Sequence, residues 1–246
     1  MANVTNKRVA IVTGGSGGIG KAVAEKLAAE DFAVAVHYSG NKAKADDLVN
    51  TIVANGGEAI SVGGDVAEEA AMTTLFDEVE HAFGGIDVVI NTAGIMRLSP
   101  VAELDWDIFD QVHRTNTRGA FVIAKIASKR VREGGAVIHF STSVTRTNFP
   151  TYAAYAASKA AVETLTRISS KELRGKNITV NAVAPGPTAT PLFLDGKDEE
   201  TIANIANANP MARLGTPEDI AEVSAFLAGP GRWVNGQVVF ANGGMA

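Results

Sequence analysis

The chain contains 246 residues, and 46% of them are hydrophobic, which is enough for one large folded domain with a substantial core. The 22 Lys and Arg residues against 27 Asp and Glu residues give a net charge of -5, and no block of like charges occurs. Nucleic acid and anionic membranes are therefore not expected as partners. The lack of cysteine excludes disulfides, thiolate nucleophiles and Cys-bound metals.

Neither a signal peptide nor a membrane span is evident in the sequence. The first residues, MANVTNKRVAIVTGG, lack a long apolar run and a small-residue cleavage site, and no apolar stretch of about 18 residues follows. We therefore expect a cytoplasmic protein. No metal site is expected either, because no metal-ligand spacing relates the dispersed histidines His37, His81, His113 and His139.

Short apolar runs alternate with helix-length segments, the pattern of successive strand–helix–strand units around a parallel sheet. The runs are apolar almost throughout, as expected where helices cover both faces of a sheet. The predicted strands are 8–12, 33–38, 58–64, 86–91, 135–141, 178–184 and 237–241. The predicted helices include 20–30, 43–55, 68–83 and 217–229. No linker or repeat divides the chain, so we predict one α/β domain over 1–246 with a doubly wound, seven-stranded parallel sheet.

A glycine-rich segment, TGGSGGIG at 13–20, lies where the first strand meets the first helix. Unpaired backbone N–H groups and the positive end of the helix dipole would face an anion there. A tight turn without a ligand is the alternative. The position after the first strand of an alternating α/β chain favours the pyrophosphate of a dinucleotide.

The end of the second predicted strand bears on the choice between NAD and NADP. Sites that select NAD usually place an Asp or Glu there, which binds the ribose and repels a 2′-phosphate. Here Tyr38 takes that position, followed by Ser39, Asn41 and Lys42, which can bond or pair with a phosphate. NADP(H) is therefore favoured over NAD(H). The alternative is that Lys42 only solvates the next helix, and Gly17 lacks a basic side chain that would strengthen the prediction.

Tyr155 and Lys159 are separated by four residues in an alanine-rich helical segment, so their side chains share one face. A nearby ammonium stabilises a phenolate and lowers its pKa from about 10 toward the working range. Tyr155 would then act as a general acid or base. The spacing alone leaves a second reading open, in which the ring is buried and the lysine extends past it.

Taken together, the motifs resemble those of the short-chain dehydrogenase/reductase family, and the resemblance covers the whole chain. Besides the glycine-rich segment, they are Asp65-Val66 after the third strand, NTAG at 91–94, Asn116 in NTRG, YAASK at 155–159, and Pro185-Gly186 with Thr188 and Thr190. Tyr152 lies outside the YAASK register. The resemblance therefore assigns the chemistry to Tyr155.

The resemblance implies interconversion of a ketone and a secondary alcohol by hydride transfer, with Tyr155 as the proton donor. Lys159 would lower the Tyr155 pKa and bind the nicotinamide ribose, and Asn116 would hold a water in the proton relay. The implied cofactor contacts are Gly14, Ser16, Gly17, Gly18, Ile19 and Gly20 in the loop, Asp65 and Val66 at the adenine, Asn91, Ala93 and Gly94 after the fourth strand, and Pro185, Gly186, Thr188 and Thr190 at the nicotinamide.

Two positions depart from the family pattern. A serine is usual thirteen residues before the tyrosine, but Thr142 stands there; threonine offers the same hydroxyl, and a loop shifted by one residue would present Ser143 or Ser141 instead. We favour Thr142 slightly over Ser143. Thr92 replaces the second asparagine of the NTAG motif, which we expect to alter a structural contact more than the chemistry.

Substrate identity is weakly specified by the sequence. The segment 190–215 joins apolar Leu192, Phe193 and Leu194 to a polar helix, and we expect it to form a lid over the substrate. The resemblance is strongest to 3-oxoacyl-carrier-protein reductases, which makes a 3-oxoacyl thioester or another ketone the leading small-molecule substrate. A sugar or polyol dehydrogenase and a non-catalytic dinucleotide sensor are the alternatives. By resemblance, the apolar faces of 105–131 and of the tyrosine helix form the interface of a homotetramer or homodimer; the alternative is that they are core.

Overall fold

A computed structural model describes residues 5–246 and contains one parallel sheet of seven strands, in the order β3-β2-β1-β4-β5-β6-β7. The strands are β1 (Arg8–Thr13), β2 (Phe32–Tyr38), β3 (Glu58–Gly63), β4 (Ile86–Asn91), β5 (Val131–Phe140), β6 (Thr179–Pro185) and β7 (Val238–Ala241). The order reverses between β1 and β4, which opens a crevice at their carboxyl ends. The predicted doubly wound sheet is confirmed.

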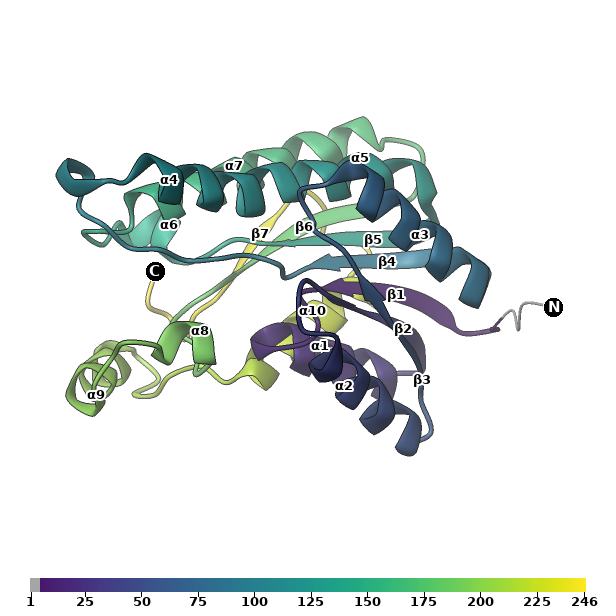
Figure 1. Cartoon of the computed structure of the whole chain (residues 1–246), viewed down its shortest axis with the longest axis horizontal. Helices are drawn as coiled ribbons and strands as arrows, with labels where there is room; N and C mark the ends of the chain where they lie inside the picture. Colours follow the sequence, from purple (N-terminus) through teal and green to yellow (C-terminus); the bar gives the residue numbers. More distant parts are fainter. Residues whose placement is uncertain (1–4) are drawn as a thin grey trace.

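Helices cover both faces of the sheet and bury two separate apolar cores (Figure 1). One face carries α1 (Gly18–Ala29), α2 (Lys42–Ala54) and α10 (Pro217–Ala228). The other face carries α3 (Glu69–Phe83), α4 (Trp106–His113), α5 (Gly119–Arg130) and α7 (Ala153–Glu172). Because the central strands β1, β2 and β4 are buried on both sides, their sequences are apolar at most positions. Among residues 5–246, none of the helices has the length and apolarity that a membrane span requires.

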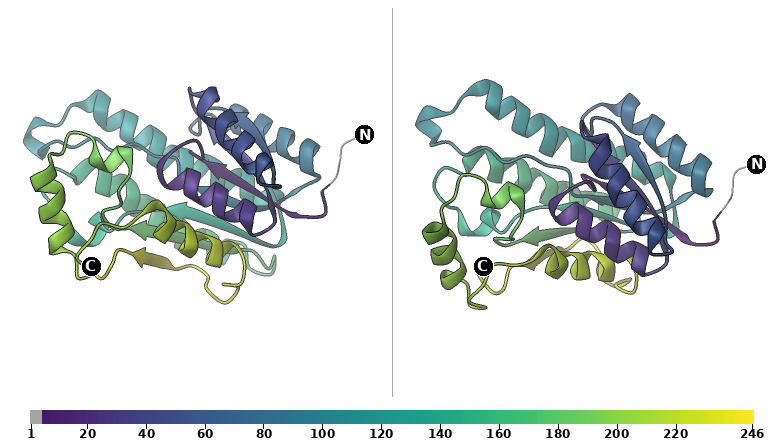
Figure 2. Two further views of the ribbon diagram at one scale, coloured as in Figure 1. Left: turned by 90° about the horizontal axis from the view of Figure 1, so that it is seen from below. Right: turned by 60° about the horizontal axis from the view of Figure 1, so that its bottom comes forward.

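The predicted start of the segment 217–229 is confirmed at α10. The hydroxyl of Thr216 accepts a hydrogen bond from the N–H of Asp219, and the Asp219 carboxylate accepts one from the N–H of Thr216. This capping box satisfies two donors that a helix otherwise leaves free. Figure 2 shows α10 lying beside α1 under the sheet, and both helices contribute to the same apolar core.

The main difference from the predicted elements is at β5. This strand begins at Val131, four residues before the predicted start, because the chain leaves α5 directly into extended backbone. Val131 pairs with Ile86, and the register shifts before pairing resumes at Val88 and Ala136. Gly134 lies inside the irregular part with a φ of +81°, a conformation that glycine adopts without strain. After Val131, the first residues of β5 are polar or glycine, so a search for apolar runs does not detect them as part of a strand.

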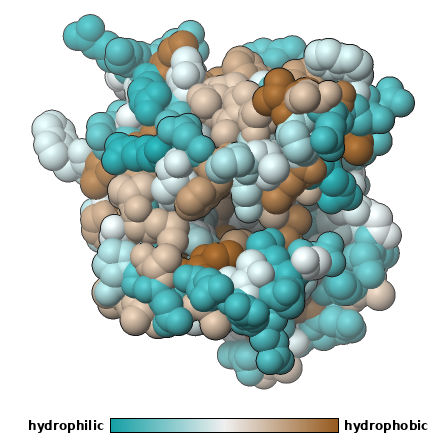
Figure 3. All heavy atoms as spheres, turned by 90° about the vertical axis from the view of Figure 1, so that its left-hand side faces the viewer, coloured by the Kyte–Doolittle hydropathy of each residue, from teal (hydrophilic) through white to brown (hydrophobic). Residues whose placement is uncertain are grey.

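All seven carboxyl ends of the strands point to one end of the molecule, at the left of Figure 1. Three short helices gather at that end: α6 (Val144–Thr147), α8 (Pro191–Leu194) and α9 (Glu199–Ala208). Seen end-on in Figure 3, apolar side chains surround a central hollow there. The fold thus brings the loops that follow β1, β4, β5 and β6 to the rim of one hollow.

Candidate active site

The glycine-rich turn between β1 and α1 leaves room for a ligand to approach the backbone. Gly14 and Gly18 have φ angles of +66° and +51°, which residues with side chains rarely adopt. A Cβ on Gly20 would lie 2.3 Å from the carbonyl oxygen of Gly14, so α1 can pack against this turn only with glycine there. Gly17 precedes α1 without any side-chain cap, which leaves the first N–H groups of the helix for an anion. This cradle of Gly14, Ser16, Gly17, Gly18, Ile19 and Gly20 fits a dinucleotide pyrophosphate.

A histidine with no role assigned from the sequence supports the same turn. His37 is 1% exposed on β2, and its Nδ1 accepts a 3.1 Å hydrogen bond from the N–H of Gly14. Its Nε2 lies 2.9 Å from the carbonyl oxygen of Gly64, just after β3. The available signal was a single imidazole inside the otherwise apolar run FAVAVHY, directly before the candidate cofactor segment.

The residues predicted to bind a 2′-phosphate lie together after β2, and two of them already have local partners. Asn41 caps α2 by accepting a hydrogen bond from the N–H of Lys44. Lys42 forms an exposed ion pair with Asp46 at 2.7 Å. Tyr38 packs against the backbone of β3, and neighbouring Ser39 is exposed. Lys42 must therefore exchange Asp46 for a phosphate if it is to bind one.

Asp65 and Val66 lie beyond the end of β3, beside the glycine turn. The Asp65 carboxylate accepts a hydrogen bond from the N–H of Ala67 and pairs with Arg114 at 2.7 Å. Val66 is buried against Gly119, where any Cβ would lie 2.8 Å from the valine side chain. Both residues are fixed in place, as a site for an adenine ring requires.

The segment after β4 connects the cofactor cradle to the tyrosine helix. Asn91 is buried and accepts a 2.7 Å hydrogen bond from the last residue of β1. The backbone of Ala93 lies 3.0 Å from where a Cβ of Gly14 would be. A Cβ on Gly94 would lie 3.1 Å from Nζ of Lys159. Thr92, which replaces an asparagine of the family motif, donates a hydrogen bond to the backbone carbonyl of Thr13 at the end of β1.

The segment after β6 closes the other side of the cradle. Pro185 ends the strand and Gly186 follows it, and both residues, with Thr188 and Thr190, line a cavity at the carboxyl end of the sheet. The Thr190 methyl lies 3.6 Å from the position of a Cβ on Gly18. Every residue that the sequence placed at the cofactor therefore lies on this one crevice or at its β2 and β3 edge.

Tyr155 and Lys159 lie one turn apart on α7, with Nζ of Lys159 6.0 Å from the centre of the tyrosine ring. Burial lowers the Lys159 pKa to about 8, and its ammonium donates a 2.9 Å hydrogen bond to the carbonyl of Phe140. Burial raises the Tyr155 pKa to about 12; the hydroxyl of Thr142 opposes the rise, and Tyr152 adds to it. The expected lowering of the Tyr155 pKa is therefore wrong, because burial is the largest influence on the phenol and raises its pKa. At neutral pH the phenol carries its proton.

The two candidate hydroxyls after β5 have different surroundings. The Thr142 hydroxyl lowers the pKa of Tyr155, and it also accepts a 3.3 Å hydrogen bond from the N–H of Val144. Ser143 instead accepts a 3.1 Å hydrogen bond from Asn242 and donates to the carbonyl of Ala184 at 3.4 Å. Ser143 is thus engaged with the backbone and the C-terminal segment, whereas Thr142 is the hydroxyl beside the phenol.

A buried carboxylate on α7 fixes the loop that carries these hydroxyls. Glu163 accepts hydrogen bonds from Ser141 at 2.7 Å and from Thr145 at 2.8 Å, and it pairs with Arg167. Tyr155, Lys159 and Glu163 recur every four residues along one helix face. The helix that bears the phenol therefore also grips the loop on either side of Thr142. Sequence reasoning missed Glu163, since its partners lie about 20 residues away.

Asn116 lies in a π-helical turn, Arg114–Arg118, that joins α4 to α5. Its Oδ1 accepts a 2.8 Å hydrogen bond from the N–H of Ile95, and its Nδ2 donates to the carbonyl of Ile95 and to Ser158. The extra residue of the turn aims the amide at the loop after β4. Asn116 therefore connects that loop to α7, one residue from Lys159.

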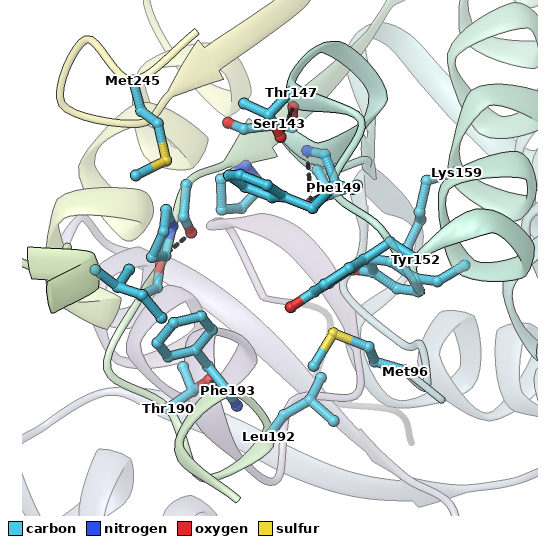
Figure 4. A pocket seen from close by; sticks show the side chains of 18 of the residues that line it. Met96, Ser143, Thr147, Phe149, Tyr152, Lys159, Thr190, Leu192, Phe193 and Met245 are labelled. Atoms are coloured by element: carbon cyan, nitrogen blue, oxygen red, sulfur yellow. Dashed lines mark hydrogen bonds between the residues drawn. The ribbon is translucent and has the colours of Figure 1, made fainter. Parts of the chain in front are cut away.

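A cavity of about 550 Å³ opens beside Tyr155, Thr142 and Lys159. Figure 4 shows the Tyr152 hydroxyl pointing into it, with Phe149 above and with Met96, Leu192 and Phe193 below. Among the described residues that line it, Lys159 is the one with a charged side chain. The cavity can hold a neutral molecule with an apolar body, and Tyr155 and Thr142 supply hydroxyl groups at its wall.

The segment 190–215 forms the mouth of this cavity. It contains α8 and α9, joined through Gly196 with a φ of +72°. Thr188 and Gly215 pair at its base, and Asn209 bonds the carbonyl of Asn242. Figure 2 shows both short helices standing off the sheet at its carboxyl end. The segment is anchored at its ends, and its cavity-lining residues are apolar at Leu192, Phe193, Ile205 and Ala208 and polar at Thr190, Thr201 and Asn204.

Comparison with known proteins now places the chain. Residues 14–246 match the family described as "Enoyl-(Acyl carrier protein) reductase". A "Short-chain type dehydrogenase/reductase" from Picea abies is 44% identical over 248 residues, covering 96% of this chain and 92% of that protein. The chain belongs to the short-chain dehydrogenase/reductase family. The family members that match this chain are named as reductases. The protein is accordingly an NAD(P)-dependent oxidoreductase that acts on carbonyl or CH–OH groups.

Two further matches within the family carry cofactor information. An "NADPH-dependent aldehyde reductase-like protein, chloroplastic" from Arabidopsis thaliana is 40% identical over 252 residues, covering 96% of this chain and 93% of that one. The crystal structure of an angucycline C-6 ketoreductase with bound NADP superposes with a TM-score of 0.91 at 32% identity, covering 99% and 97% of the two chains.

Proposed function

We propose that the protein reduces a ketone or an aldehyde with NADPH and that Tyr155 is the general acid. The observation that carries this proposal is a buried, protonated phenol at the wall of an apolar cavity, directly beside the dinucleotide cradle. The phenol's proton is available for the oxygen of a carbonyl compound bound in the cavity. The protonated phenol is in the state that carbonyl reduction requires of its proton donor.

NADPH is the cofactor, and when bound it supplies the hydride. The glycine turn would hold its pyrophosphate, Asp65 and Val66 its adenine, and Lys42 with Ser39 its 2′-phosphate. The end of β2 carries no carboxylate that would repel that phosphate. The NADPH-dependent relative and the NADP-bound neighbour support the same choice.

In the proposed reaction, Tyr155 transfers its hydroxyl proton to the carbonyl oxygen as negative charge develops there. Thr142 donates a hydrogen bond to the same oxygen and so stabilises that charge. Lys159, still largely protonated at neutral pH, favours the tyrosinate that remains and is within one helical turn of it. Asn116 holds the loop after β4 and hence Gly94 against Lys159.

The cavity supports a substrate with a neutral, apolar body. Phe149, Tyr152 and Phe193 provide aromatic surfaces, and the described lining offers neither a carboxylate nor an arginine. A 3-oxoacyl thioester fits this description through its acyl chain, as does a cyclic or aromatic ketone. A sugar or polyol is the weaker candidate, because most of the lining surface is apolar. We propose that the lid at 190–215 closes over the apolar part of the substrate.

We also propose that the chain forms homotetramers or homodimers. Large apolar side chains that a monomer would leave in water are Trp106 on α4, Phe121 on α5 and Ile168 on α7. They are 71%, 50% and 50% exposed and lie on the helices whose apolar faces the sequence singles out. Light scattering of the purified protein tests the proposal; a monomer at micromolar concentration would contradict it.

The test of the proposed reaction follows nicotinamide absorbance while the purified protein and NADPH meet a panel of carbonyl compounds. The panel contains a 3-oxoacyl thioester, an aromatic ketone, an apolar aldehyde and a ketose, each with wild type, Tyr155→Phe and Tyr152→Phe. We expect turnover of the apolar members, loss of it in Tyr155→Phe, and retention in Tyr152→Phe. Preference for the ketose would contradict the substrate proposal. Tight NADPH binding without turnover of any member would favour the sensor.

A further inference from the structure

We propose that His37, in its neutral form, is a positioning residue for the dinucleotide, and that protonation of its ring weakens cofactor binding. The residue ties the glycine turn after β1 to the loop after β3, the two segments between which the dinucleotide would lie. The inference rests on the proposed dinucleotide site. It is independent of Tyr155 and of the substrate.

The two contacts of the ring fix its protonation state. The N–H of Gly14 can only donate, so Nδ1 of His37 must accept and carries no proton. The carbonyl oxygen of Gly64 can only accept, so Nε2 must donate. One neutral tautomer satisfies both contacts, and the doubly protonated ring satisfies only one. Protonation would direct an N–H of the ring at the N–H of Gly14.

The Gly14 peptide has little freedom to absorb such a change. A Cβ at Gly14 would lie 3.0 Å from the side chain of Thr92, and a Cβ at Gly20 would lie 2.3 Å from the carbonyl oxygen of Gly14. The peptide is thus enclosed by the loop after β4, by α1 and by His37. Repulsion from a protonated ring would displace the turn whose backbone forms the pyrophosphate cradle.

The charges around His37 set the pH at which this occurs. Burial lowers the His37 pKa from 6.5, while its bond to the Gly64 carbonyl and the negative charge of Asp65 oppose the fall. Asp65 is paired with Arg114, whose positive charge reduces the effect of Asp65 on the His37 pKa. Because the neutral form is favoured in the folded protein, cofactor binding is intact at pH 6.5 and above. It is lost as the pH falls through the lowered pKa.

Titration of NADP⁺, which survives acid, into the full-length protein tests the inference through the dissociation constant. The variants are His37→Asn, whose side-chain oxygen takes about the place of Nδ1 but cannot titrate, and His37→Phe, which fills the ring's space without a hydrogen bond. At about pH 7.5 we expect affinity within about threefold of wild type for His37→Asn and about tenfold weaker for His37→Phe. His37→Phe that folds and binds as tightly as wild type would overturn the inference.

The pH dependence is the readout that a merely structural role would not move. As the pH falls below 6.5, wild type should lose affinity for NADP⁺ more steeply than His37→Asn does, because only wild type has a ring at this position to protonate. Ionisation of the cofactor's own 2′-phosphate acts on both proteins alike. His81→Asn, which removes an exposed histidine of α3, should follow wild type. Equal slopes for wild type and His37→Asn would contradict the inference.

Nitrogen chemical shifts of the imidazole provide a measurement without cofactor. At neutral pH, His37 should show the neutral ring with the proton on Nε2, and His37→Asn assigns the signal by its loss. A proton on Nδ1, or a charged ring at neutral pH, would overturn the inference. If wild type binds no NADP⁺ at all while its His37 has the expected tautomer, the proposed dinucleotide site fails instead.

Discussion

The dinucleotide side of the site and the substrate side are built from different kinds of atoms. On the dinucleotide side, backbone groups of the turn after β1 form the cradle, and glycines permit their close approach. On the substrate side, side chains from the loops after β4, β5 and β6 and from the C-terminus line the cavity. The dinucleotide side depends on the absence of side chains at a few glycine positions. The substrate side depends on which side chains distant segments bring together.

This difference has a consequence for binding and for specificity. A backbone cradle recognises a pyrophosphate that is the same for every member of the family, so a local sequence pattern suffices to encode it. An apolar cavity recognises a particular substrate shape, so the side chains that line it can change while the fold persists. Substitutions on the two sides should therefore separate cofactor affinity from substrate affinity.

The largest effect is expected from Gly20→Val on the dinucleotide side. A side chain there would overlap the carbonyl oxygen of Gly14 at 2.3 Å, and the turn must open to accept it. We expect NADPH affinity to fall by more than about a hundredfold, or the fold to be lost, as read by NADPH titration and thermal unfolding. Ala29→Val is the matched control, because it adds bulk at the exposed far end of α1, the helix that contains Gly20. Equal affinities of the two variants would contradict a cradle built on close approach.

A smaller effect is expected from Glu163→Leu, which acts on the substrate side. The substitution removes the acceptor of the Ser141 hydroxyl and one of the two acceptors of the Thr145 hydroxyl, and so loosens the loop that holds Thr142. We expect kcat to fall by roughly tenfold to a hundredfold and the free energy of unfolding to fall by about 2 kcal/mol, with NADPH affinity unchanged.

Glu163→Gln is the matched control for that loop. It keeps one acceptor oxygen for the two hydroxyls, so kcat should recover most of the loss. If Glu163→Leu weakened NADPH binding as much as it slowed turnover, the two sides of the site would not be separable.

The smallest effect is expected from Phe193→Ala at the lid. Removing the ring deletes apolar contact with the substrate, at a cost of about 1.5 kcal/mol, or about tenfold in KM. NADPH affinity should not change. Val53→Ala shortens an exposed apolar side chain on α2, away from the cavity, and should leave KM unaltered. A lower KM for the Phe193 variant with an apolar ketone would contradict the proposed apolar contact between the Phe193 ring and the substrate.

The same difference explains how much of the fold and site the sequence could predict. All seven strands were predicted from their short, mainly apolar runs, and the largest boundary difference is the irregular start of β5. The glycine turn and the Tyr155–Lys159 pair were recognisable because their spacing is local. Each of these features is encoded within about ten consecutive residues.

What could not be predicted depends on contacts between distant segments. The role of His37 depends on Gly64, 27 residues away, and that of Glu163 on Ser141, 22 residues away. The roles of Thr142 and Ser143 separate only through Tyr155 and Asn242. The raised pKa of Tyr155 reflects burial, which spacing along a helix does not report. The Lys42–Asp46 pair is an exception, because its four-residue spacing is local and could have been read from the sequence.

The central claim is that Tyr155 donates the proton in NADPH-dependent carbonyl reduction, and a single-turnover experiment tests it most directly. The protein, preloaded with NADPH, is mixed with the best apolar ketone of the panel, and nicotinamide oxidation is followed through the first turnover. The account predicts that Tyr155→Phe slows this step by about a hundredfold or more, with NADPH affinity unchanged, and that Tyr152→Phe stays within a few fold of wild type. A first turnover in Tyr155→Phe as fast as in wild type would contradict it.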